Sequence, residues 1–241
     1  MEFLRLIAAF ILFLASLVHP QAAIDPSGHW EGAVQIPNME MKIEIDLTKN
    51  SKGELAGTFG QPAQNLKGFP LSTLVADGAS VHFVIKASAN PATFDGTIDG
   101  DGKSITGEVK QGEYTVPFTL VRTGEARIAA TPKSAPIGKQ LEGTWNGTLE
   151  VDGKPMRLVV KMANQPDGTA AGTVMSPDGS GTEIPIAMTH KASTVTIDVV
   201  QVGASFSGEL NAAGTELTGT WTQQSLALPL TLRRAATASK E

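Results

Sequence analysis

The sequence predicts an all-β protein of two tandem eight-stranded antiparallel up-and-down barrels, closed or partly open. Three observations predict this architecture: period-2 alternation of apolar and polar residues, Asp-Gly pairs between the alternating runs, and an internal repeat. A two-sheet sandwich is the alternative arrangement for the same strands.

Alternation is clearest in residues 39–47, where apolar residues occupy every second position and charged or polar residues lie between them. Residues 81–85 and 195–199 repeat the pattern. Asp-Gly pairs supply the positive φ angles of tight hairpins, and they occur at Asp77-Gly78, Asp101-Gly102, Asp152-Gly153, Asp167-Gly168 and Asp178-Gly179. Eight short strands joined by sequential hairpins close into a barrel economically, because closure removes exposed strand edges.

The internal repeat sets the domain boundaries. Residues 28–32 (GHWEG) match 143–147 (GTWNG) at an offset of 115, and 117–120 (PFTL) match 229–232 (PLTL) at an offset of 112. We therefore predict one barrel domain over 24–123, an Ala/Pro-rich linker over 124–140, a second barrel domain over 141–234 and a flexible tail over 235–241. The linker composition predicts domains that move independently.

Residues 1–23 have the pattern of a signal peptide, with Arg5, an apolar run over 6–18 and the small residues Ala22 and Ala23. The run is shorter than the roughly 20 residues of a membrane-spanning helix. We expect an exported protein, periplasmic or extracellular, with no membrane span once the peptide is removed. The chain has no cysteine and a net charge of -5, so we expect no disulfide and no nucleic-acid partner.

Glycines and prolines recur at equivalent places in the two copies. Four glycines in each copy lie on the apolar face: Gly32, Gly57, Gly96 and Gly107, then Gly147, Gly172, Gly208 and Gly219. One interpretation is that these glycines let the strands coil tightly and let aromatic rings pack over the backbone. The other is that they surround a cavity. The close-packing interpretation is favoured because side chains nearly fill a small barrel. Prolines inside strand-like runs predict interruptions, either bulges or an access crevice, at Pro70, Pro117, Pro185 and Pro229.

Two resemblances follow from these motifs. Gly-x-Trp on the first strand with an arginine ending the last strand resembles the lipocalin and avidin signature, so Arg122 and Arg234 are expected to stack over Trp30 and Trp145 and close each barrel. Nearly the whole chain after residues 1–23 also resembles the accessory β-module that precedes many bacterial secreted α/β-hydrolases. That resemblance is carried by residues 143–147, 176–178, 183–185, 206–208 and 217–223. It implies an accessory role, although a second copy stands here where the hydrolase domain would begin.

The sequence contains no recognisable catalytic motif. A nucleophile elbow needs Gly-x-Ser-x-Gly, and the nearest run, 203–207 (GASFS), lacks the second glycine. We interpret His29, His82 and His190 as solvated side chains, and residues 99–102 (DGDG) as a hairpin turn rather than a calcium loop. The prediction is a noncatalytic protein without catalytic residues, metal ligands or cofactor.

Three function classes remain open. The first is a protein that holds a small apolar or amphipathic ligand inside a barrel. Its candidate lining is Trp30, Met41, Phe83, Phe94, Phe118, Trp145, Met156, Phe206 and Trp221. The second is an interaction module with filled barrels that presents its outer surface to an extracellular protein or polymer. The third is an enzyme with an unfamiliar site.

Overall fold

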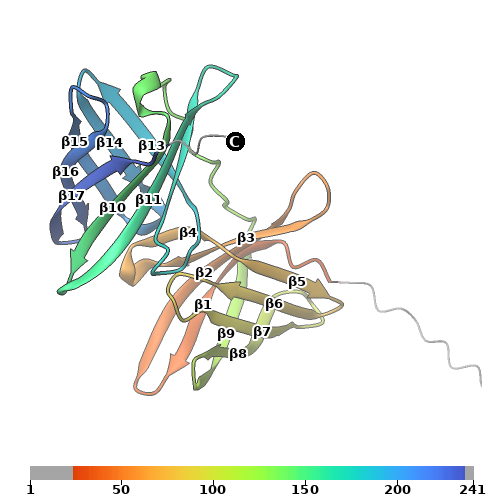
Figure 1. Cartoon of the computed structure of the whole chain (residues 1–241). Helices are drawn as coiled ribbons and strands as arrows, with labels where there is room; N and C mark the ends of the chain where they lie inside the picture. Colours follow the sequence, from red (N-terminus) through yellow and green to blue (C-terminus); the bar gives the residue numbers. More distant parts are fainter. Residues whose placement is uncertain (1–23, 237–241) are drawn as a thin grey trace, which may run out of the picture.

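The computed structural model describes residues 24–236, which form an all-β protein of two antiparallel sheets (Figure 1). The predicted signal peptide and residues 237–241 of the predicted tail lie outside the described residues. Within the described part, no helix has the length and apolar character needed to cross a membrane. The all-β prediction is therefore confirmed, and the two copies of the repeat form separate sheets.

The first copy forms an open nine-stranded sheet, which we name the N-terminal sheet, in the order β4-β3-β2-β1-β9-β8-β7-β6-β5. Its strands are β1 (Gly28–Ile36), β2 (Met39–Lys49), β3 (Leu55–Gln61), β4 (Leu66–Pro70), β5 (Thr73–Asp77), β6 (Ser80–Ile85), β7 (Ala92–Ile98), β8 (Ser104–Gln111) and β9 (Tyr114–Gly124). A short 3-10 helix, η1 (Pro62–Gln64), joins β3 to β4. The sheet is strongly curled but open and has nine strands instead of eight, so this copy corresponds to the partly open form of the prediction and not to the closed form.

The second copy forms the closed eight-stranded barrel that the sequence predicts, and we name it the C-terminal barrel. Its strands are β10 (Gly143–Val151), β11 (Lys154–Asn164), β12 (Ala170–Met175), β13 (Ile184–Lys191), β14 (Thr194–Val199), β15 (Ala204–Leu210), β16 (Glu216–Gln223) and β17 (Leu226–Arg234). Two 3-10 helices, η2 (Lys139–Leu141) and η3 (Val200–Val202), precede β10 and β15.

The fourth strand explains the difference in strand number. In the C-terminal barrel, β13 pairs with β12 as far as Ile186 and with β14 from Ala187 onward, so one continuous strand changes its partner. In the N-terminal sheet the equivalent residues are divided into β4, which pairs with β3, and β5, which pairs with β6. The extra strand is therefore the same element broken in two.

The break in the N-terminal sheet lies between Leu71 and Ser72. The Leu71 N–H donates to the Gly57 carbonyl at 3.0 Å, and the Ser72 N–H donates to the Val84 carbonyl at 2.9 Å. The chain thus changes from one neighbouring strand to the other within two residues. The predicted interruption at Pro70 is found, because β4 ends at this proline.

The other three predicted interruptions differ from this one. Pro185 lies inside β13, which continues past it, so that prediction is wrong. Pro117 and Pro229 are also inside strands, paired with Glu108 and Thr220. Because proline donates no hydrogen bond, it is tolerated where its nitrogen faces away from the paired neighbour.

Alternating side chains fill the inner face of each sheet. In β2, Ile43, Ile45 and Leu47 are buried, and the charged residues between them are not. The Asp152-Gly153 turn has positive φ at both residues, 52° and 72°, as a two-residue hairpin loop requires. In the longer loop between β12 and β13, the positive φ falls on Gly181 instead of the predicted Gly179.

Candidate functional site

The predicted interior residues lie in two packed aromatic cores. In the N-terminal sheet Trp30 is fully buried, and Phe83 and Phe94 stack with ring centroids 4.6 Å apart. Phe118 packs edge-on against both phenylalanines. Met41 is only partly buried beside this core.

The C-terminal barrel has a matching core. Trp145 and Phe206 are fully buried, Trp221 is 6% exposed, and Met156 is partly buried against the cluster. These side chains fill space that a ligand would need. The role of all nine residues in ligand binding stays a prediction.

The inward glycines support the close-packing interpretation. A Cβ atom on Gly32 would lie 1.9 Å from the carbonyl oxygen of Thr119, and one on Gly96 would lie 2.9 Å from the ring of Phe118. The Phe206 ring would lie 2.5 Å from a Cβ on Gly208. At these positions glycine lets neighbouring backbone or an aromatic ring approach closely.

The tryptophan on the first strand of each copy stacks with an arginine at the end of the last strand, as expected from the resemblance to lipocalins. The guanidinium carbon of Arg122 lies 4.4 Å from the Trp30 ring centroid, and that of Arg234 lies 4.6 Å from the Trp145 ring centroid. Arg122 Nε also donates to the carbonyl of Gly102 at 2.8 Å. The arginines therefore cover one end of each core by stacking and by main-chain hydrogen bonds.

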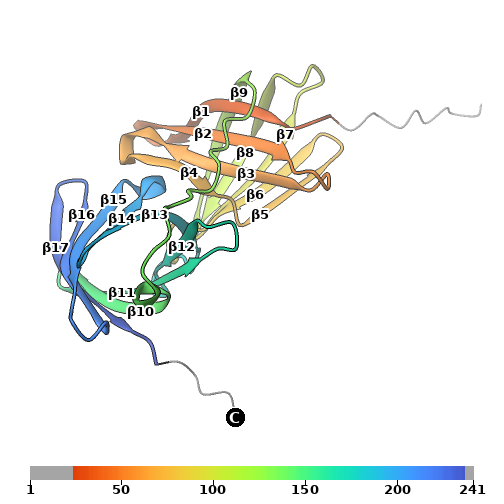
Figure 2. The same ribbon diagram turned by 90° about the horizontal axis from the view of Figure 1, so that it is seen from above.

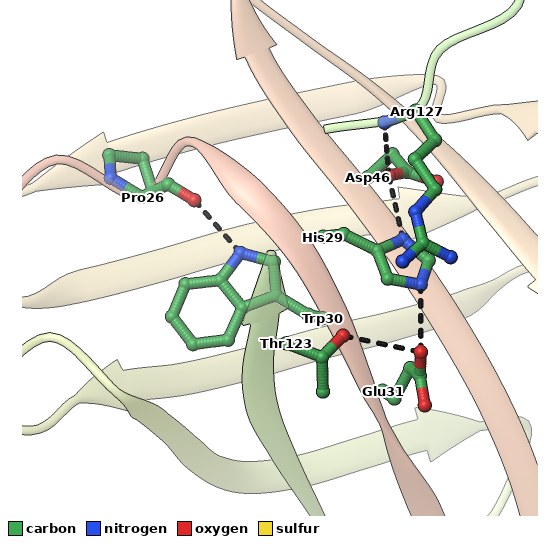
Figure 3. A network of polar contacts seen from close by, with 7 residues as sticks. All are labelled: Pro26, His29, Trp30, Glu31, Asp46, Thr123 and Arg127. Atoms are coloured by element: carbon green, nitrogen blue, oxygen red, sulfur yellow. Dashed lines mark hydrogen bonds and ion pairs between the residues drawn. The ribbon is translucent and has the colours of Figure 1, made fainter. Parts of the chain in front are cut away.

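A polar network around one buried histidine lies on the outer face of the N-terminal sheet (Figure 3). His29 is 2% exposed, with Nδ1 at 2.8 Å from Asp46 and Nε2 at 3.1 Å from Glu31. The Arg127 N–H donates to the same Asp46 oxygen at 2.6 Å, and the Thr123 hydroxyl donates to Glu31 at 3.2 Å. Only a doubly protonated imidazole donates to both carboxylates at once.

This network corrects the interpretation of His29 as a solvated side chain. The other two histidines differ from it and from each other. His82 pairs with Asp95 at 2.7 Å on a half-exposed surface. His190 accepts from the Gly138 N–H at 3.3 Å through Nδ1, and its Nε2 is buried, so it is not simply solvated. Within residues 24–236, no group of three or more His, Asp or Glu side chains is arranged to hold a metal ion.

The segment predicted as a flexible linker is attached to both sheets. Arg127 bonds to the N-terminal sheet through Asp46, as described above. Farther along, Ser134 exchanges two main-chain hydrogen bonds of 2.9 Å with Ala170, and its hydroxyl accepts from the Met188 N–H at 2.7 Å. These bonds attach the segment to both copies (Figure 2), and the independent movement of the domains stays a prediction.

A cleft of about 520 Å³ lies between the two copies beside this segment. Its lining comes from the outer face of β1 to β4, from the linker segment and from η3: His29, Glu44, Asp46, Thr58, Gly60, Lys67, Gly68, Arg127, Ala129, Ala130, Pro132, Val200 and Gln201. The volume is within the range of small-molecule sites, which often occur between domains.

The cleft combines charged and apolar groups. Lys67 and Arg127 face it together with Glu44 and Asp46. Val200 is 58% exposed, which is unusual for so apolar a side chain. The side-chain oxygen of Gln201 is buried and has no hydrogen-bond partner within residues 24–236. This oxygen is closed off from solvent, so the polar groups that a ligand in the cleft can contact are the charged side chains.

None of the cleft residues was predicted as a site residue. Their chemistry depends on the linker and η3 lying against the outer face of the N-terminal sheet. Alternation assigns His29, Glu44 and Asp46 to that outer face, but it carries no information about what covers them. The residues predicted from the sequence face the two inner cores instead.

The fold thus defines the chain as a duplicated all-β protein with one curled open sheet and one closed barrel. No known protein family and no curated protein matches the sequence. Among solved structures, the chain is similar to a Bacteroides fragilis protein provisionally named as an outer membrane protein, with 15% identity over 87% of this chain and 97% of that chain and a TM-score of 0.30. It is also similar to a DUF3598-family protein of unknown function from Nostoc punctiforme, with 14% identity over 87% and 96% of the two chains and a TM-score of 0.28.

Proposed function

We propose that this chain is a noncatalytic, exported binding protein that holds a small amphipathic ligand in the cleft between its two copies. The cleft of about 520 Å³ is the observation that carries the proposal. Export is inferred from the signal-peptide pattern of residues 1–23.

The location in the cleft follows from how the two interiors are packed. Trp30, Phe83 and Phe94 are at most 1% exposed in one core, and Trp145 and Phe206 are fully buried in the other. Opening either interior for a ligand would separate stacked aromatic rings and leave contacts unmade. The cleft needs no such rearrangement.

The lining defines the kind of ligand. The exposed Val200 and the linker residues Ala129, Ala130 and Pro132 supply an apolar side. The carboxylates of Glu44 and Asp46 supply hydrogen-bond acceptors. A ligand with an apolar body and at least one N–H or O–H donor satisfies both features.

Native mass spectrometry of protein purified gently from its own host tests the proposal. We expect one bound small molecule per chain. Ala130→Trp fills the cleft and should abolish the bound species. Ala135→Trp, an exposed position of the same segment outside the cleft lining, is the control and should retain it. An empty wild-type protein, or equal retention by both variants, would contradict the proposal.

The alternative is an interaction module with filled barrels that binds an extracellular protein or polymer. The packed interiors favour it, and so does the exposure of large apolar side chains at two hairpins of the N-terminal sheet. Met39 is 58% exposed and Tyr114 is 79% exposed. If the purified protein is empty, Met39→Ser and Tyr114→Ser should weaken its binding to the envelope fraction of its host.

A further inference from the structure

The duplication produces two equivalent grooves on the outer surface. The groove of the N-terminal sheet has a volume of about 380 Å³ and includes Gly32 and Pro62 in its lining. The groove of the C-terminal barrel has a volume of about 610 Å³ and includes Gly147 and Pro177, which are the equivalents at the repeat offset. Both therefore occupy the same place in the repeat, beside the first two strands of each copy.

The charge of the two grooves is opposite. The N-terminal groove, which we name the acidic groove, is lined by Glu31, Glu40 and Glu44 with a single cation, Lys42. The C-terminal groove, which we name the basic groove, has two arginines and no carboxylate in its lining. Asn146 replaces Glu31 and Val159 replaces Glu44 at the equivalent positions.

The seam between the first and last strands is also more open at the basic groove. In the N-terminal sheet, β1 pairs with β9 from His29 to Val34. In the C-terminal barrel, the pairing of β10 with β17 ends at Asn146 and Arg233. A Cβ on Gly32 would lie 1.9 Å from the facing carbonyl oxygen, but one on Gly147 would lie 2.8 Å from its equivalent.

The shortened pairing affects the main chain of two groove residues. In an unbroken ladder Thr148 would pair with Thr231, as Ala33 pairs with Thr119 in the first copy. Both threonines line the basic groove instead. Because the ladder does not pair these two threonines, their main-chain groups are not used in pairing between β10 and β17.

Each of the two arginines of the basic groove is paired with a carboxylate on the protein surface. Arg157 Nε donates to Asp178 at 2.9 Å, and Arg233 Nε donates to Glu216 at 2.8 Å. Neither carboxylate is in the groove lining. Within residues 24–236, Nη1 of Arg157 and both Nη atoms of Arg233 have no hydrogen-bond partner, so each guanidinium keeps donors for a ligand.

We propose that the basic groove binds the anionic group of a small ligand, a carboxylate or a phosphate, through Arg157, Arg233 and the main chain of Thr148 and Thr231. Positioned guanidinium and main-chain N–H donors are the groups that proteins use for such oxyanions. The acidic groove repels the same ligand. This site is separate from the cleft between the copies, so it stands whether or not the cleft holds a ligand.

Titrations of the ¹⁵N-labelled protein with sodium glucuronate and with inorganic phosphate test the proposal, with glucose as the neutral control. We expect the amide signals of Thr148 and Thr231 to shift with at least one anion, and the shifts to weaken in high salt. Glucose should produce no shift. The anion that binds more tightly identifies the group for which the groove is suited.

The first copy supplies the matched variants. Arg233→Val introduces the residue found at the equivalent Val121, and Asn146→Glu introduces that of Glu31. Each should weaken anion binding by about tenfold or more, with unchanged thermal unfolding. Lys42→Gln in the acidic groove is the control and should leave the anion affinity unchanged. Unshifted Thr148 and Thr231 amides with both anions would overturn the proposal, as would unchanged affinity in both folded variants.

Discussion

The two copies keep the same framework but are weakly paired at different places. The N-terminal sheet has a long seam between β1 and β9 and a break in its fourth strand at Leu71 and Ser72. The C-terminal barrel has a continuous fourth strand and a short seam that ends at Asn146 and Arg233. The same repeat therefore forms an open sheet in one copy and a closed barrel in the other, and the strand pairing is interrupted at a different place in each copy.

The two copies share the contacts that hold each core together and differ in the side chains on their outer faces. Both copies keep the buried tryptophan, the stacked arginine and the glycines at close backbone approach. They differ on their outer faces, where the first copy has His29 and the second has Thr144. Substitutions at the contacts that both copies share should therefore lower stability strongly and by similar amounts in the two copies. Substitutions at the positions that differ should have local effects.

Replacing the tryptophans gives the largest expected effect. Trp30→Ala and Trp145→Ala each remove a fully buried ring and its stacking with arginine, and each should destabilise its copy by about 3–5 kcal/mol. Urea unfolding followed by circular dichroism measures this. The milder replacements Trp30→Phe and Trp145→Phe are the controls. If one alanine variant is destabilised and the other is not, the two cores are not equivalent.

The next largest loss of stability is expected at Gly107 and its equivalent in the second copy, Gly219. A Cβ on Gly107 would lie 2.0 Å from the Asp95 carbonyl oxygen, and one on Gly219 would lie 2.1 Å from that of Ser207. Gly107→Ala and Gly219→Ala should each cost about 1–3 kcal/mol, because the strands must separate. Gly100→Ala, with nothing within 4 Å, is the control and should change little. Equal thermal stability of all three variants would show that the neighbouring strands separate to admit the methyl group without a loss of stability.

Alternation and turn residues predicted the strands of both copies because burial of one face requires a period of two. The sequence predicted an interruption at Pro70 and equally at Pro185, and it could not show that only the first would end a strand, because the two prolines occupy the same register. The burial of His29 was not predictable either. It depends on a distant segment that covers the outer face, and local sequence does not specify that contact.

Replacing His29 should lower stability by an intermediate amount, and this effect is specific to the first copy. His29→Thr introduces the residue of the second copy and leaves Asp46 without its ring partner. We expect a loss of about 1–3 kcal/mol and faster hydrogen exchange at the Arg127 amide. His82→Thr is the control, because that ring is half exposed beside Asp95. Unchanged exchange at Arg127 would show that the network does not hold the linker segment.

The smallest expected effect on stability comes from the ion pair of Asp178 and Arg157. This pair has no counterpart in the first copy, where Ala63 and Lys42 stand at the equivalent positions. Hydrogen bonds from the Arg157 side chain and main chain lower the pKa of Asp178 from 3.8 to about 2. A carboxyl group with a lowered folded-state pKa contributes its full stabilisation above pH 3.8 and loses it as the pH falls through about 2.

An NMR titration of the Asp178 carboxyl should therefore have its midpoint near 2, and Arg157→Gln should move the midpoint up toward the ordinary 3.8. In the same titration the Arg157 side-chain signals should shift only below pH 4, because the carboxylate stays charged above it. A midpoint near 3.8 in the wild-type protein would mean that Asp178 does not fix the guanidinium. The basic groove would then differ from the acidic groove in charge alone, without a positioned donor.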